Sequence, residues 1–431
     1  MRPVPGSTEP LGQLPPQDWM EAPETAQVVA ALMAEGADVR FVGGCVRDSV
    51  LKRPIKDIDI ATHDPPERVM DLLAKAGIRV IPTGIAHGTV TAVIGKAHYE
   101  ITTLREDVET FGRHAKVSFT DDWTADAARR DFTMNAMCAD PQGRIYDPFN
   151  GLADLGAGIV RFVGDPVKRI DEDVLRLLRF FRFFAHYGRP PMDAPALAAC
   201  RRMAPELAKL SGERVAGELI RLLQARDPGS VLLVMQGEGV LPHILPEATQ
   251  FTRLKVLTWL DSRAIVRPSV QPDAIRRLGA LLSADAAGIE AVGERLKLSG
   301  AQTKRLAAIV VPRIEIQRSM DARAARRALR KVGADEFRDL VLVAWAGERA
   351  SEVRARAAET AEWTRLLDLA DNWQPVELPV RGADALELGV PRGPQVGRVL
   401  AAVERWWEDN DYRPGREAAL DKLREVVSAP A

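Results

Sequence analysis

The first third of the chain mixes short apolar runs with amphipathic stretches. Residues 80–82, 89–94 and 99–104 are short and carry β-branched side chains, which is typical of strands. The last two runs are separated by a short polar stretch that begins with Gly95, so they are predicted to form a hairpin. This part of the chain is therefore predicted to hold a small mixed β-sheet with flanking helices.

From residue 171 onward, the apolar positions recur at helical spacing. Val174, Leu177, Leu178 and Phe181 follow the i, i+3, i+4, i+7 pattern that places side chains on one helix face. Short segments with Pro or Gly interrupt this pattern several times, but no further strand pattern follows. The fold class is therefore predicted to be α+β, with an N-terminal head that contains the sheet and an all-α neck, body and tail.

At 431 residues the chain is too long for one ordinary domain. The Pro-rich and polar start predicts a flexible leader, and the change from mixed to helical patterning predicts where the head ends. The predicted parts are a leader (1–22), a head (23–155), a helical neck (156–226), and a helical body and tail (227–431).

The composition limits the classes of partner and location. The net charge is −1, so any nucleic-acid surface must be a local patch. Residues 160–226 supply one, with 13 Lys or Arg against 8 Asp or Glu. The three cysteines lie far apart, without disulfide or zinc spacing, which favours a reducing cytoplasm. No stretch of 18 apolar residues predicts a membrane span, and the leader lacks the apolar core of a signal peptide.

The first chemical motif is Gly43-Gly44, with Arg47 and Asp57-x-Asp59 after it. An apolar run ends in the two glycines, where backbone N–H groups at a helix start can approach a phosphate. On a strand, Asp57 and Asp59 share one face, and two carboxylates plus substrate phosphates suit Mg²⁺. Alone, an Asp-x-Asp pair more often marks a solvated strand edge. Together, these residues predict a nucleoside triphosphate site with metal-assisted displacement.

A second motif, Arg129-Arg130-Asp131, precedes an apolar stretch that contains Asn135. Adjacent arginines usually lie on a solvated face, but guanidinium groups also bind phosphate oxygens through two hydrogen bonds. We expect Arg130 to bind the triphosphate and Asn135 to orient neighbouring groups. The later run 147–151 is expected to be a turn that closes the head.

The third motif places Asp173, Arg176, Arg179 and Arg182 three residues apart, and this spacing predicts one stripe on a helix. An ordinary salt-bridged helix surface is the simpler interpretation, but this stripe follows directly on the predicted nucleotide head. Asp173 would accept a hydrogen bond from an exocyclic amino group, and Arg176 would donate to the neighbouring ring nitrogen. Cytosine and adenine offer that pattern, whereas uracil and guanine offer the reverse. Such polar matching can reject the wrong base by roughly 10⁴-fold.

These motifs resemble those of class II CCA-adding tRNA nucleotidyltransferases of the polymerase β superfamily. The resemblance is carried by five motifs in the family's order: 43–48 with 57–59, 129–132, 147–151, 172–176 and 211–218. It implies a polymerase-β-like head in which Asp57 and Asp59 bind Mg²⁺. It also implies that the nucleotide is bound by Gly43, Gly44, Arg47, Arg130, Asp173, Arg176, Arg179 and Arg182. The implied reaction adds C, C and A to tRNA 3′ ends from CTP and ATP, without a nucleic-acid template.

Bacterial poly(A) polymerases look similar in the head and are the nearest alternative. Residues 104–123 resemble the flexible loop and following strand of CCA-adding enzymes near the mitochondrial type, which makes Arg105 and Arg113 candidate substrate-side residues. Two further alternatives are kept. One is an enzyme that adds only CC or only A, and the other is a non-catalytic tRNA-binding protein, against which the intact Asp57 and Asp59 argue. His243 is the only histidine after residue 190, so the phosphohydrolase domain of some relatives is not expected.

Two tail segments and one head residue are further candidates. A basic cluster at helical spacing lies within 323–331, where a solvated helix face is the first interpretation and RNA contact the second. The Gly- and Pro-rich segment 389–397 is expected to open a helix whose N–H groups could hold a tRNA phosphate. Glu100 starts a predicted strand and could add a third carboxylate to the metal pair.

Overall fold

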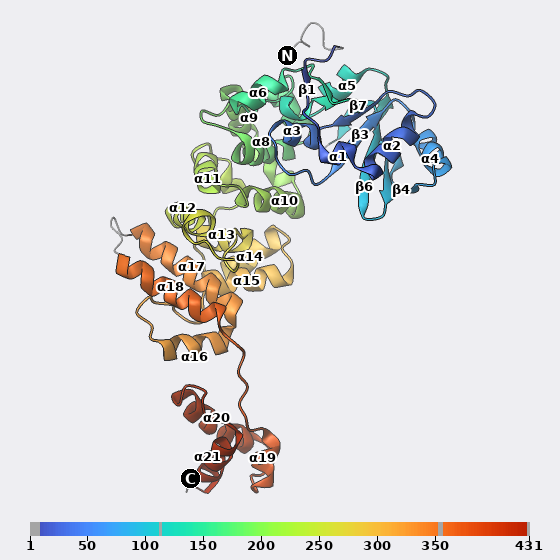
Figure 1. Cartoon of the computed structure of the whole chain (residues 1–431). Helices are drawn as coiled ribbons and strands as arrows, with labels where there is room; N and C mark the ends of the chain where they lie inside the picture. The colour runs from blue at the N-terminus through green and yellow to red at the C-terminus, as the bar shows by residue number, and fades with distance from the viewer. Residues whose placement is uncertain (1–8, 112–113, 352–356, 429–431) are drawn as a thin grey trace. The chain divides into compact units, whose positions relative to one another are not determined.

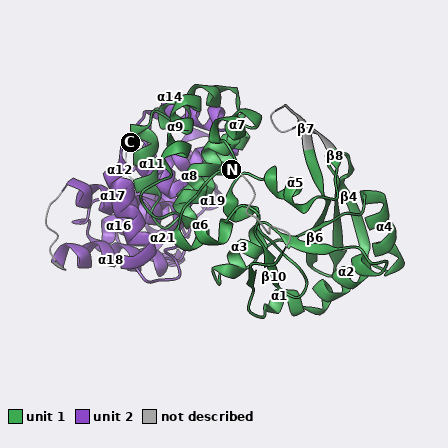
Figure 2. Cartoon of the chain, turned by 90° about the horizontal axis from the view of Figure 1, so that it is seen from above, with its two compact units in different colours: residues 1–246 green, residues 247–431 purple. Residues whose placement is uncertain are grey.

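The computed structural model describes residues 9–111, 114–351 and 357–428. The chain forms two compact units, residues 1–246 and 247–431 (Figure 2). The first unit holds all strands of the described residues (Figure 1). The body was predicted to start at residue 227, whereas the first unit extends to residue 246 because helix α11 (Pro228–Gly237) packs on α8 (Leu175–Tyr187).

The head is built on an eight-stranded mixed sheet with strand order β1-β10-β9-β2-β3-β6-β5-β4. Only β3 and β6 run parallel, and the other neighbours are antiparallel. The strands are β1 (Gly12–Gln13), β2 (Val39–Val42), β3 (Ile58–Thr62), β4 (Arg79–Gly84), β5 (Thr89–Ile94), β6 (Ala97–Thr103), β9 (Cys138–Ala139) and β10 (Arg144–Tyr146). The predicted α+β fold and the predicted hairpin of β5 and β6 are confirmed.

Two helices, α2 (Pro23–Met33) and α4 (Pro66–Lys75), pack side by side against this sheet (Figure 1). Each starts with a proline in its first turn, where the missing N–H is not needed. Their apolar faces, which include Leu32 and Leu73, are fully buried against the sheet. Helix α2 thus packs on β2, and α4 packs on β4, β5 and β6, the strand that carries Glu100.

The prediction of a flexible leader over residues 1–22 is wrong for residues 9–22. Gly12 and Gln13 form β1, which pairs with β10 at the edge of the sheet. Leu14 is buried, and the Trp19 ring packs edge-on against Phe41 at 4.8 Å. Isolated apolar residues between prolines are therefore enough to anchor this segment, because each one finds a place in the core.

The segment that was expected to be a loop and a following strand forms two paired strands, β7 (Arg105–Phe111) and β8 (His114–Phe119). They make a separate two-stranded sheet, and helix α5 (Trp123–Ala128) follows directly. The backbone N–H of Arg105 donates to the Asp126 carboxylate at 3.4 Å, which ties the start of β7 to α5. Arg113 lies outside the described residues.

The rest of the first unit is helical. Its remaining helices are α1 (Asp18–Glu21), α3 (Gly44–Val50), α6 (Gly151–Ala157), α7 (Pro166–Glu172), α8 (Leu175–Tyr187), α9 (Ala194–Met203), α10 (Gly212–Leu223) and α11 (Pro228–Gly237). The expected turn at 147–151 is present, because the Asp147 carboxylate accepts from the N–H groups of Gly151 and Leu152 at the start of α6.

The second unit is helical in its described residues, as predicted. Its helices are α12 (Phe251–Trp259), α13 (Ala274–Leu281), α14 (Ala286–Arg295), α15 (Gly300–Val310), α16 (Ala322–Val332), α17 (Ala334–Ser351), α18 (Ala357–Asp371), α19 (Gly382–Glu387), α20 (Pro394–Asp409) and α21 (Arg416–Ser428). The helix start predicted within the 389–397 segment is present, with Pro394 in the first turn of α20. No helix in the described ranges is long and apolar enough to cross a membrane.

The basic cluster of 323–331 lies on α16, where three of its arginines are paired with acidic residues of the same unit. Arg326 binds the Asp411 carboxylate through two hydrogen bonds of 2.6 Å, Arg327 pairs with Asp409, and Arg330 pairs with Glu404 and Glu408. The Arg330 guanidinium also lies over the Trp407 ring. These contacts give the three arginines a structural role in joining α16 to the end of α20.

Candidate active site

All ten predicted site residues line one cavity of about 700 Å³ in the first unit. Its lining contains eight arginines and four aspartates, so the cavity carries a strong positive excess. A concave site of this charge suits an anionic ligand such as a triphosphate. The predicted residues in its wall are Gly43, Gly44, Arg47, Asp57, Asp59, Arg130, Asp173, Arg176, Arg179 and Arg182.

The glycine turn joins β2 to α3, as predicted. Gly43 has φ = 71°, a left-handed conformation that side chains other than glycine rarely adopt. A Cβ atom on Gly43 would also lie 3.3 Å from an Nη atom of Arg130. Glycine therefore allows both the turn and the close approach of the arginine to the start of α3.

The two carboxylates lie at the start of β3, with Asp57 exposed just before the strand and Asp59 inside it. Asp59 faces Glu100 in register on the parallel strand β6. Burial, followed by the negative charge of Glu100, raises the pKa of Asp59 to about 6, although Arg130 opposes this shift. Asp57 also contributes repulsion. A divalent cation would offset this repulsion, and carboxylate oxygens are ligands that Mg²⁺ accepts.

Among the described residues, no three His, Cys, Asp or Glu side chains are arranged to hold a metal ion together. A pair of carboxylates nevertheless fits Mg²⁺, which usually takes its other ligands from water and substrate phosphates. The donor set is consistent with a metal that binds together with a nucleotide.

Buried acids hold the cavity arginines in place. Arg129 and Arg130 bind the two oxygens of Asp126 at 2.8 and 3.0 Å. Burial opposes the charge of Asp126, but the two guanidinium groups outweigh it and lower the pKa of this carboxyl. Arg182 is held in the same way by Glu218, which is almost fully buried. Because these acids hold the guanidinium groups through hydrogen bonds and ion pairs, the arginine side chains are oriented before any ligand arrives.

A continuous chain of hydrogen bonds connects α3 with α8. Arg47 donates to the Asn135 side-chain oxygen at 2.7 Å, and the Asn135 amide donates to Asp131 at 2.9 Å. The other Asp131 oxygen accepts from Arg179 Nε at 2.7 Å. Burial opposes the charge of Asp131, but Arg179 and Asn135 outweigh it, so its pKa is lowered. Asn135 thus bridges two predicted phosphate-binding arginines, in agreement with the orienting role expected for it.

The predicted single stripe of Asp173, Arg176, Arg179 and Arg182 is wrong in one respect. Asp173 is not helical, because the helix breaks between α7, which ends at Glu172, and α8, which begins at Leu175. Asp173 has an extended backbone (φ = −151°, ψ = 106°) and accepts the Leu175 N–H at 3.1 Å. The break still leaves Asp173 and Arg176 in the same cavity wall.

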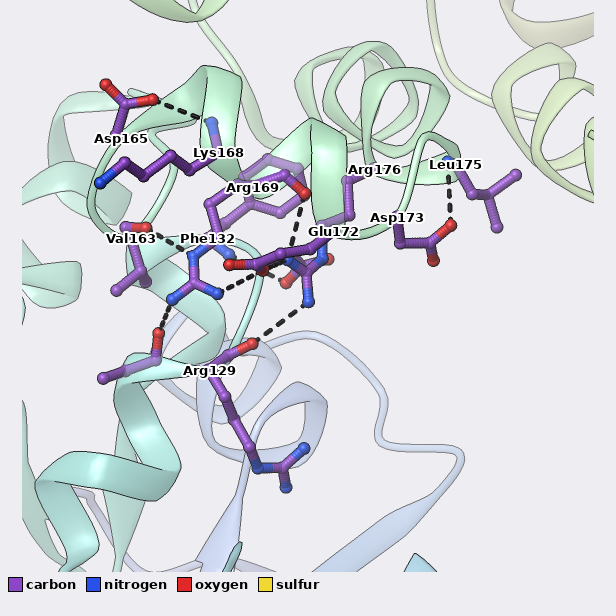
Figure 3. Close-up of polar contacts among 12 residues, drawn as sticks. Arg129, Phe132, Val163, Asp165, Lys168, Arg169, Glu172, Asp173, Leu175 and Arg176 are labelled. Atoms are coloured by element: carbon purple, nitrogen blue, oxygen red, sulfur yellow. Dashed lines mark hydrogen bonds and ion pairs between the residues drawn. The ribbon is translucent and has the colours of Figure 1, made fainter. Parts of the chain in front are cut away.

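Each of the two candidate base-reading residues has its own partner. Nη2 of Arg214 donates to both Asp173 oxygens, at 2.9 and 2.8 Å. Arg176 pairs with Glu172 and donates to the backbone oxygens of Arg169 and Arg129 (Figure 3). These contacts fix where the Asp173 carboxylate and the Arg176 guanidinium lie.

Sequence reasoning assigned no role to the partners Arg214, Glu218 and Asp126, although the first two fall in a motif that it used. The spacing of Asp126 from Arg129 and Arg130, three and four residues, is a local signal that could have revealed the pair. Arg214 and Glu218 gave no such signal, because their partners Asp173 and Arg182 lie more than thirty residues away.

Comparison with known proteins places this cavity in context. Residues 39–161 match the family described as "Poly A polymerase head domain", and residues 192–252 match "Probable RNA and SrmB- binding site of polymerase A". The mitochondrial CCA tRNA nucleotidyltransferase 1 of Danio rerio is 32% identical over 393 residues, which is 90% of this chain and 87% of that protein. The chain belongs to the CCA-adding tRNA nucleotidyltransferase family. The resemblance found in the motifs is therefore confirmed.

Two further relatives agree with this family assignment. The CCA-adding enzyme of Streptococcus gordonii is 32% identical over 411 residues, covering 94% of this chain and 98% of that protein. The structure of the Bacillus stearothermophilus CCA-adding enzyme in complex with CTP matches with a TM-score of 0.73 at 28% identity, covering 93% of this chain and 96% of that one. The fold and the enzyme class predicted from the sequence are thus confirmed.

Proposed function

We propose that this protein adds CCA to the 3′ ends of tRNA from CTP and ATP, without a nucleic-acid template. The observation that carries the proposal is a single cavity with three features in its wall. These are the two carboxylates of Asp57 and Asp59, the glycine turn at the start of α3, and the carboxylate and guanidinium of Asp173 and Arg176, which suit a base edge. The relatives named above carry this activity in their names. The family uses nucleoside triphosphates, and its structures include complexes with CTP, ATP and tRNA.

In the proposed reaction, the terminal hydroxyl of tRNA attacks the α-phosphate of the nucleotide in line, and pyrophosphate leaves. The N–H groups at the start of α3 and Arg47 bind the phosphates, together with Arg130, Arg179 and Arg182. Asp57 and Asp59 would hold Mg²⁺, which activates the attacking oxygen and neutralises the charge that develops on the pyrophosphate. Because their acidic partners fix the arginines beforehand, little side-chain reorganisation is needed at the moment of reaction.

Base choice is proposed to rest on Asp173 and Arg176. The carboxylate accepts from the amino group of cytosine or adenine, and the guanidinium donates to the ring nitrogen beside it. Uracil or guanine would set a carbonyl oxygen against the carboxylate, and two acceptors facing each other cannot form a hydrogen bond. A site built on such polar pairs rejects the mismatched base far more strongly than a pocket that reads only shape.

The cytoplasm is kept as the proposed location, although three of the relatives are named mitochondrial. Fractionation of the source cells with an antibody against the chain tests this proposal. Recovery in an organelle fraction would contradict it.

The experiment for the activity supplies three tRNA substrates, ending before CC, before A, and after CCA, with CTP and ATP separately and together. We expect two cytidines on the first substrate with CTP alone, one adenosine on the second with ATP, and no addition to the third. Products resolved at single-nucleotide length check this result. Runs of A would favour a poly(A) polymerase, and a stop after CC on the first substrate with both nucleotides present would favour a CC-only enzyme.

A further inference from the structure

Two arginines of the neck, Arg169 and Arg176, lie side by side and donate hydrogen bonds to the C-terminal end of α5 (Figure 3). Arg169 donates through Nη2 to the Ala128 carbonyl oxygen, and Arg176 donates through Nη2 to the Arg129 carbonyl oxygen at 3.3 Å. The final carbonyl groups of a helix have no partner inside the helix, and cations are favoured near them. The two guanidinium groups therefore complete the end of α5.

The two arginines are also joined to each other through one carboxylate. Oε2 of Glu172 accepts from Nη1 of Arg169 at 2.6 Å and from Nη1 of Arg176. In addition, the backbone oxygen of Arg169 accepts from Nη1 of Arg176 at 3.1 Å, and Arg169 Nε donates to the Val163 backbone oxygen at 2.9 Å. Arg169 thus contacts the Arg176 side chain both through Glu172 and through its own backbone oxygen. The Val163 backbone oxygen fixes the position of the Arg169 guanidinium.

Arg169 itself does not line the cavity, whereas Arg176, Arg129 and Arg130 do. The carbonyl groups that Arg169 and Arg176 hold belong to the residues just before Arg130, a predicted triphosphate ligand. The side chain of Arg169 is 15% exposed, so its contacts are shielded from water but not fully buried. This residue is placed to act on the base-reading arginine and on the phosphate side of the cavity without touching the nucleotide.

We propose that Arg169 is a positioning residue for base selection, which orients Arg176 through Glu172 and fixes it relative to the end of α5. The inference rests on the proposed function, because it assigns to Arg176 the reading of the base edge. Small displacements of a positioned group can cost about a hundredfold in rate. Loss of the Arg169 side chain therefore leaves Arg176 charged and present but imperfectly aimed.

The test compares Arg169→Met with wild type in single-nucleotide addition to tRNA that ends before CC, using CTP and UTP separately. We expect the ratio of kcat/KM for CTP over UTP to fall about 10- to 100-fold, mainly through CTP. Arg161→Met is the matched control, since Arg161 lies in the same unit, pairs with Asp154, and does not line the cavity. The control is expected to keep the wild-type ratio.

A double variant separates positioning from a general structural effect. If Arg169 acts through Arg176, then adding Arg169→Met to Arg176→Met should not lower the CTP/UTP ratio further. Arg169→Lys, which keeps a charge for Glu172 but loses the planar fork, should give an intermediate ratio and serves if the Met variant does not fold. A wild-type ratio in both Arg169 variants, or additive losses in the double variant, would overturn the inference. A wild-type enzyme that shows no preference for CTP would instead overturn the proposed function.

Discussion

Replacing Asp57 or Asp59 by asparagine is expected to lower nucleotide addition at least about 10³-fold. A metal that activates the attacking oxygen and neutralises the leaving group is worth several kcal/mol, and each 1.4 kcal/mol is about tenfold in rate. Asparagine keeps the size of the side chain but removes the negative charge that the cation needs. The measurement is the single-turnover rate of CTP addition at saturating nucleotide and tRNA.

The carboxylate variants should still bind tRNA with an affinity within about twofold of wild type, because the basic groups of the neck are unchanged. Asp64→Asn is the matched control, since this carboxylate follows the same strand β3 but does not line the cavity. The control should keep the wild-type rate. Substantial addition by Asp57→Asn and Asp59→Asn in the presence of Mg²⁺ would show that the metal assignment is wrong.

The second large effect is expected at Asp173. Replacing it by alanine should lower the preference for CTP over UTP by roughly 10²- to 10⁴-fold, because the acceptor for the base amino group is lost. The structure adds a reason to expect faster addition from UTP by this variant. Arg214 donates to both Asp173 oxygens in the native protein, and in the variant this guanidinium is freed to donate to a uracil carbonyl oxygen.

Single-nucleotide addition from each of the four triphosphates measures this change. Glu213→Ala is a suitable control, because Glu213 is an exposed acid next to Arg214 that does not line the cavity. It should leave the nucleotide preference intact. If Asp173→Ala also keeps the wild-type preference, base selection does not depend on this carboxylate.

Most of the cavity could be predicted because its residues lie in short motifs whose spacing carries the chemistry. Two glycines at the end of an apolar run, followed by Asp57 and Asp59, define a turn and a strand within seventeen residues. The backbone geometry that results, including the left-handed Gly43, depends on local preferences that glycine alone satisfies. Sequence reasoning therefore predicted residues that the fold brings together in one cavity wall.

The helix break at Asp173 could not be predicted in the same way. Neither Pro nor Gly marks it, and Val174 continues the apolar spacing of the helix. The break is stabilised by Arg214, forty-one positions further along the chain, which binds the Asp173 carboxylate. A tertiary contact thus overrides a local helical preference, and no spacing rule within one segment reveals such a partner.

The first strand was missed for a related reason. Strand β1 has only two residues, Gly12 and Gln13, which form no apolar pattern. Its partner strand β10 lies more than 130 positions away. Strand β7 was hidden because its sequence, Arg-Glu-Asp-Val-Glu-Thr-Phe, is mostly charged and lacks the alternation of a half-buried strand. Pairing with β8 supplies the backbone hydrogen bonds that the composition did not suggest.

The most direct test of the account is a crystal structure of the protein with tRNA that lacks the terminal A, a non-hydrolysable ATP analogue, and Mn²⁺ in place of Mg²⁺. We predict anomalous density for Mn²⁺ at about 2.0–2.2 Å from oxygens of Asp57 and Asp59, with the adenine amino group against Asp173. Manganese that contacts neither carboxylate, or a nucleotide bound outside the arginine-lined cavity, would contradict it.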